Sequence, residues 1–71
     1  MSEVRAEMVA TIMTVVVAEG AQVAAGQTLL VLESMKMEIP VLAEAAGAVI
    51  GLPVAVGAVV QEGDVLVVLD P

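Results

Sequence analysis

The residues that could carry chemistry in this chain of 71 are few. There is no His and no Cys, so the commonest general base, the thiol nucleophile and the usual ligands of structural zinc are all missing. The chain has one Lys and one Arg, and its hydroxyl groups belong to Ser2, Thr11, Thr14, Thr28 and Ser34. We therefore predict no catalytic residues and no metal site, which leaves the only lysine as the side chain with distinctive reactivity.

That lysine, Lys36, occupies the midpoint of the chain, in the segment Glu33-Ser34-Met35-Lys36-Met37-Glu38. A hairpin over this segment leaves Met35 and Lys36 as a two-residue loop, with the pairs Val31/Pro40, Leu32/Ile39, Glu33/Glu38 and Ser34/Met37 on either side. Two-residue loops prefer type I′ turns, in which both central residues have positive φ and Asn-Gly is the favoured sequence. Met-Lys is a poor choice for that geometry, and a broken local rule often marks a functional site.

The same residues also fit an ordinary protein surface. Glu33 and Glu38 would face each other as a like-charge pair, which a solvated Lys36 would help to offset. Methionines commonly fill gaps in cores, although a position beside a turn argues against burial of Met35 and Met37. Residue types and spacing alone therefore leave a functional and a merely structural interpretation of this segment equally open.

An internal repeat predicts how the segment is positioned. Displaced by 37 positions, residues 17–33 align with residues 54–70, and nine of the 17 pairs are identical. Two of the identical pairs are glycines, Gly20/Gly57 and Gly26/Gly63, and glycine is typical of turns. Two copies are too few for a solenoid, so the repeat predicts two similar halves related by a pseudo-two-fold axis.

Short valine-rich segments between glycine turns predict an all-β domain over residues 1–71, because no helix of normal length fits between the turns. We expect two antiparallel sheets packed as a sandwich or flattened barrel. Pro40 falls at a non-bonded position of the expected hairpin, so its missing N–H points away from the partner strand. The expected strands span residues 4–6, 11–18, 22–23, 28–33, 38–42, 48–54, 59–60 and 64–69, and the turns lie at residues 19–20, 25–26, 44–47, 56–57 and 62–63.

Charge and hydropathy exclude two classes of partner. With a net charge of −7, two basic residues and no aromatic ring, the chain cannot neutralise or stack on a nucleic acid. The longest uncharged stretch, residues 45–61, is 17 residues long and contains Gly and Pro, whereas a membrane-spanning helix needs about 20 apolar residues. The N-terminus lacks the positive charge of a signal peptide. We expect a soluble, cytoplasmic monomer.

The segment around Lys36 closely resembles the attachment sequence of biotinyl domains in the biotin/lipoyl attachment family, where a Met-Lys-Met core holds the biotinylated lysine. Nearly the whole chain shares the resemblance, because residues 19–27 and 56–64 are similar to the family's two turn regions. The departures are residues 6–12, where the family usually has Ala-Pro-Met-x-Gly, and Ser34, where Ala is common. The resemblance implies two antiparallel four-stranded sheets, a barrel-sandwich hybrid, with the lysine at a hairpin tip.

By this resemblance the protein is a biotin carrier domain. A biotin protein ligase would join biotin to Lys36, with Met35 and Met37 serving recognition and Glu33 and Glu38 flanking them. A lysine amine is protonated at neutral pH and the two carboxylates can only stabilise that form, so the ligase must activate the amine. The attached biotin would carry a carboxyl group between biotin carboxylase and carboxyltransferase subunits. Since the chain runs from Met1 to Pro71 without a linker, we expect a free-standing attachment protein, similar to the short biotinylated proteins of mycobacteria and to biotin carboxyl carrier domains.

Three alternatives compete with this interpretation. A lipoyl carrier domain would resemble this chain, but such domains usually carry Asp-Lys-Ala at the tip, so Met35 and Met37 favour biotin. An unmodified structural or interaction module is the second, and the absence of any modified lysine in cells would favour it. An autonomous enzyme is the third, and we disfavour it because Glu33 and Glu38 at an exposed tip would have no pocket.

Overall fold

The computed structural model describes all 71 residues and contains eight β-strands. Their bounds are β1 (Ser2–Arg5), β2 (Ala10–Val15), β3 (Gln22–Val23), β4 (Thr28–Ser34), β5 (Met37–Leu42), β6 (Gly47–Gly51), β7 (Val59–Val60) and β8 (Val65–Asp70). No helix that could cross a membrane is present. All eight regular elements are strands, so the predicted all-β class is confirmed.

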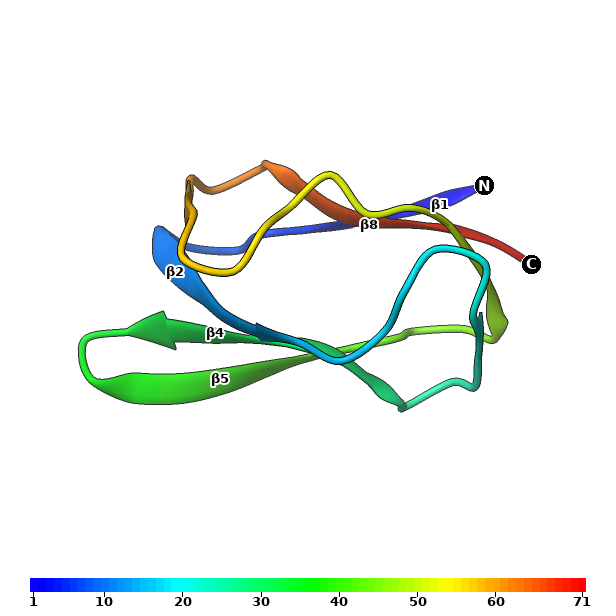
Figure 1. Ribbon diagram of the computed structural model, residues 1–71, viewed down its shortest axis with the longest axis horizontal. Helices are drawn as coiled ribbons and strands as arrows, with labels where there is room; N and C mark the ends of the chain where they lie inside the picture. The colour runs from blue at the N-terminus through cyan, green and yellow to red at the C-terminus, as the bar shows by residue number, and fades with distance from the viewer.

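The strands form two four-stranded antiparallel sheets that pack on one another (Figure 1). One sheet has the order β1-β8-β6-β3 and the other the order β5-β4-β2-β7. The molecule measures 32 × 17 × 17 Å. The β4–β5 hairpin projects from one end of the long axis, and both chain termini lie at the other end (Figure 1). This is the predicted flattened sandwich of two sheets.

Residues separated by 37 positions occupy equivalent places in the two halves of the structure. Strands β1 to β4 map onto β5 to β8 in order, and the strand order of one sheet becomes that of the other. A β-bulge after Ile12 in β2 recurs after Val49 in β6. The N–H of Gly57 donates to the Ile12 carbonyl at 2.8 Å, and the N–H of Gly20 donates to the Val49 carbonyl at the same distance. The predicted pseudo-two-fold relation is confirmed.

The core obeys the same relation. All 14 buried residues fall into seven pairs separated by 37 positions, namely Ala6/Ala43, Ala10/Gly47, Ile12/Val49, Val23/Val60, Leu29/Leu66, Leu30/Val67 and Leu32/Leu69. No polar or charged side chain is among them. Burial of one Val, Leu or Ile side chain stabilises by about 1.5–3 kcal/mol. A core without aromatic rings is thus assembled from seven residues of each half.

Some strands end earlier than the sequence pattern predicts. β2 ends at Val15 rather than at residue 18, and β6 ends at Gly51 rather than at residue 54. After each of these ends the chain crosses to the other sheet, where the turn at Gly20 bonds to β6 and the turn at Gly57 bonds to β2. β1 covers residues 2–5 rather than 4–6, because β8 pairs with it from Ser2 onward. The other strands differ from their expected bounds by at most one residue at either end.

Gly47 was expected in a turn and instead begins β6 in the buried interior. A Cβ atom at this position would lie 2.9 Å from the carbonyl oxygen of Asp70. The glycine therefore permits the close approach of β6 to the last residue of β8, rather than a change of chain direction.

Candidate functional site

The β4–β5 hairpin has the predicted register. Its pairs include Leu32/Ile39, Glu33/Glu38 and Ser34/Met37, so Met35 and Lys36 form the two-residue turn. Their φ angles are 53° and 65°, and two consecutive positive values are the feature that defines a type I′ turn. The predicted hairpin, its register and the turn geometry are confirmed.

This turn places two ordinary residues where the backbone favours glycine. Met35 and Lys36 are the only non-glycine residues of the chain with positive φ. The left-handed conformation costs a residue with a Cβ atom about 1–2 kcal/mol. Such strain persists where the surrounding structure holds it in place, and here β4 and β5 pair along their whole length behind the turn. The sequence thus departs from the stablest choice at the one projecting point of the fold.

The side chains of the turn face solvent. Met35 is 92% exposed and Met37 is 62% exposed, so neither fills a gap in the core, in agreement with the prediction. Lys36 is exposed and has no hydrogen bond, and no carboxylate lies within 4.0 Å of its amine, because the single ion pair of the chain joins Arg5 and Glu3. The amine at the tip is therefore unpaired and accessible to another protein.

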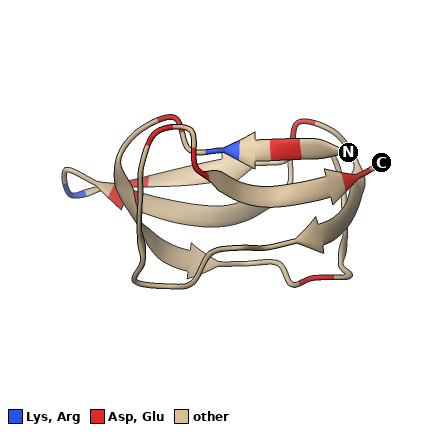
Figure 2. Ribbon diagram, turned by 90° about the horizontal axis from the view of Figure 1, so that it is seen from above, with Lys and Arg blue, Asp and Glu red and all other residues tan.

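Two carboxylates stand at the base of the turn. Glu33 and Glu38 are directly opposite each other and both are exposed. Figure 2 shows a basic residue at the hairpin tip and acidic residues at its base, and in the whole chain nine acidic residues face two basic ones. Neither carboxylate contacts Lys36 closely enough to form an ion pair, so the amine is not held by them.

A contact that the sequence pattern did not reveal ties the hairpin to the rest of the fold. The hydroxyl of Ser34 donates to the carbonyl of Val9 at 3.3 Å. Val9 precedes β2, so the bond links the end of β4 to the connection between β1 and β2. Only the long-range pairing of β2 with β4 brings these residues together, and no local signal could have found them.

Pro40 lies opposite Val31, as predicted. β5 is the edge strand of its sheet, so no further strand lies beyond Pro40 to accept a hydrogen bond. A proline is tolerated at such an edge because its missing N–H faces away from the ladder. The rigid residue therefore does not interrupt the pairing that supports the tip.

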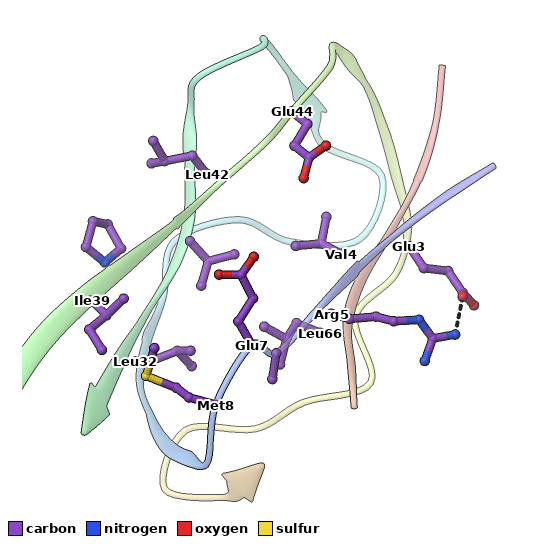
Figure 3. Close-up of a pocket in the computed structure, with 13 residues that line it drawn as sticks. Glu3, Val4, Arg5, Glu7, Met8, Leu32, Ile39, Leu42, Glu44 and Leu66 are labelled. Atoms are coloured by element: carbon purple, nitrogen blue, oxygen red, sulfur yellow. Dashed lines mark hydrogen bonds and ion pairs between the residues drawn. The ribbon is translucent and has the colours of Figure 1, made fainter. Parts of the chain in front are cut away.

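A cavity of about 370 Å³ opens between β1 and β5 (Figure 3). Pseudo-symmetry mates line it from both sides, including Val4 with Val41 and Glu7 with Glu44, so it lies where the two halves meet. None of residues 33–38 lines it. Nowhere do three or more Asp and Glu side chains gather in a way that could hold a metal ion. The arrangement at the tip can therefore present an amine for modification, and no residue of the tip lines the cavity.

Comparison with known proteins supports one family for this chain. Residues 2–69 match the biotin/lipoyl family model, which is described as "Biotin-requiring enzyme". The chain is 55% identical over 67 residues to "Biotinylated protein TB7.3 homolog" of Mycobacterium leprae, which is 94% of either chain. It is 43% identical over 63 residues to "Biotin/lipoyl attachment protein" of Bacillus subtilis, covering 89% of this chain and 86% of that protein.

Solved structures share the fold. The urea carboxylase of Kluyveromyces lactis superposes with a TM-score of 0.90 at 29% identity over 97% of this chain. A single-chain, multi-domain long-chain acyl-CoA carboxylase superposes with a TM-score of 0.87 at 38% identity over 93% of this chain. The chain corresponds to only 6% and 7% of those two proteins. Its fold and the match along nearly its whole length show that the chain belongs to the biotin/lipoyl attachment domain family.

Proposed function

We propose that this protein is a biotin carrier, with biotin joined to the side-chain amine of Lys36. The observation that carries the proposal is the tip of the β4–β5 hairpin, where an unpaired, exposed lysine sits in a strained type I′ turn. It is the only lysine of the chain. The projecting turn offers its amine to a partner while the two sheets behind it stay packed.

In this proposal the protein holds the amine and a biotin protein ligase supplies the chemistry. The ammonium group of Lys36 first loses one proton, and the free amine attacks the carbonyl carbon of biotinyl-AMP. The new C–N amide bond replaces the C–O bond to phosphate, AMP leaves, and the nitrogen gives up a second proton and keeps one. Neither Glu33 nor Glu38 forms an ion pair with Lys36, so no carboxylate of the carrier is in place to take those protons. The base must therefore come from the ligase.

Once attached, biotin would supply a site that accepts and releases a carboxyl group. The relatives favour this use, since they include "Biotin carboxyl carrier protein of acetyl-CoA carboxylase" of Solanum lycopersicum, which is 50% identical over 58 residues. We accordingly propose that a biotin carboxylase and a carboxyltransferase are the partners that the tip visits. The cytoplasmic location and the monomeric state remain predictions from the sequence.

Co-expression with a biotin protein ligase tests the attachment site. The intact mass should rise by one biotinyl group, and Lys36→Arg should abolish the increase while the far-ultraviolet circular dichroism spectrum is unchanged, because the side chain is exposed. The double variant Lys36→Arg with Arg5→Lys is the matched control, since it moves the single lysine to β1 and should also stay unmodified.

Two outcomes would contradict the proposal. Biotin retained by the Lys36→Arg variant would place the modification elsewhere. A wild-type protein that takes lipoate from a lipoate ligase, and no biotin from a biotin ligase, would favour the lipoyl alternative instead.

A further inference from the structure

The pseudo-symmetry provides an internal comparison between the two ends of the molecule. At the end that carries Lys36, the side chains of Val9, Val56 and Val59 are 55%, 65% and 62% exposed. Their mates 37 positions away, at the end that carries the termini, are Ala46, Glu19 and Gln22. The backbone at these paired positions is alike, with φ of 91° at Gly57 and 89° at Gly20. At these three positions the far end carries small or polar residues, whereas the lysine end exposes three valines that the fold itself does not require.

These three valines, which we call the valine patch, flank the hairpin. Val59 in β7 pairs with Thr11 in β2, and Thr11 in turn pairs with Glu33 in β4, so a continuous row on one face of the sheet joins Val59 to the hairpin base. Val56 precedes Gly57, whose N–H bonds to β2. The carbonyl of Val9 accepts the hydrogen bond from Ser34. In Figure 1 the β7 region and the start of β2 lie at the same end of the molecule as the hairpin tip.

The hairpin tip by itself is too small to bind an enzyme specifically. A standard protein–protein interface uses about 20–30 residues and about 800 Å² on each partner, whereas residues 33–38 are six residues. The whole chain exposes 4175 Å², so such an interface would cover about a fifth of its surface. An enzyme that engages Lys36 must therefore rest on a neighbouring face as well.

We propose that the enzyme that acylates Lys36 docks on the valine patch. This inference rests on the proposed function. The ligase must bring its active site to the lysine amine itself, without the added reach of an attached biotin, so its footprint is confined to the flanks of the tip. The complementary surface would be apolar opposite the patch and basic opposite Glu33 and Glu38, because the carrier has a net charge of −7 and these carboxylates border the tip.

The symmetry mates supply the test variant. Val56→Glu with Val59→Gln installs the pair that the other half already carries at equivalent positions, so the fold should tolerate both side chains. We expect kcat/KM for biotin transfer by purified ligase to fall about tenfold or more, mainly through a higher KM, since the patch contributes binding and does not touch the reacting atoms. Val56→Thr with Val59→Thr, which adds no charge, should lower kcat/KM in the same direction by a smaller factor.

The reciprocal change is the matched control. Glu19→Val with Gln22→Val alters the equivalent positions at the far end and should leave kcat/KM unchanged. An unchanged kcat/KM for the Val56→Glu, Val59→Gln variant would overturn the inference. A lower kcat/KM for that variant together with an unchanged value for Val56→Thr, Val59→Thr would also overturn it, because the loss would then come from the added charge. Normal ligation with slower carboxylation of the attached biotin would assign the patch to a carboxylase and overturn the ligase assignment. If wild-type protein takes no biotin, or if Lys36→Arg retains it, the proposed function fails instead, independently of the valine variants.

Discussion

Replacing Met35 by Gly should make this protein more stable. Met35 has φ of 53°, a conformation that costs a residue with a Cβ atom about 1–2 kcal/mol. Glycine removes that cost, although its freedom in the unfolded chain offsets about 0.4–1 kcal/mol of the gain. The side chain is 92% exposed, so almost no buried contact is lost. We expect the free energy of unfolding to rise by about 0.5–1 kcal/mol, which corresponds to a melting temperature about 3–6 °C higher for a domain of this size.

The assay is unfolding in urea and by heat, followed by far-ultraviolet circular dichroism because the chain has no Trp or Tyr to report by fluorescence. Met35→Ala is the matched control, since alanine loses the same side chain but keeps the Cβ atom and the strain. Met37→Gly is the second control, because the residue lies in β5 with an ordinary strand backbone, where glycine should destabilise. A Met35→Gly variant no more stable than Met35→Ala would refute the strain argument.

The same variant separates stability from recognition. We expect Met35→Gly to be biotinylated more slowly than wild type, because the variant lacks the exposed methionine side chain that the ligase would contact. The initial rate of mass increase with purified ligase measures this. A more stable variant that is modified at the wild-type rate would contradict the recognition role of Met35 and leave the turn geometry unaffected.

Two further predictions concern the core. Gly47→Ala should lower the free energy of unfolding by about 1–3 kcal/mol, because the added Cβ atom would lie 2.9 Å from the Asp70 carbonyl oxygen, and an unchanged urea midpoint would contradict that packing. Leu29→Ala and Leu66→Ala should each cost about 2–5 kcal/mol and agree within about 1 kcal/mol, because both side chains are fully buried symmetry mates; clearly unequal urea midpoints would show that the two halves do not contribute equally.

Much of the architecture could be predicted because its signals are local or repeated. The glycine pairs of the 37-residue repeat locate matching turns, and matching turns require matching strands between them. The hairpin around Lys36 is equally local, since a two-residue loop leaves one register for the flanking residues and alternation then places Pro40 at a non-bonded position. For this reason the sequence predicted the turn at Met35 and Lys36 correctly, including its register.

Other features depend on contacts between distant parts of the chain. The early ends of β2 at Val15 and β6 at Gly51 reflect crossings between sheets, which a hydrophobic pattern does not record. The burial of Gly47 depends on the approach of Asp70.

The surroundings of the lysine are decided in the same way. Pairing of β2 with both β4 and β7 brings residues 9–11 beside Ser34 on one side and beside Val59 on the other. The amino-acid sequence by itself therefore determined which residue projects and the turn that projects it, because both follow from bonds between near neighbours. Only the tertiary structure decided which surface flanks Lys36, because that surface is assembled from strands almost 50 residues apart.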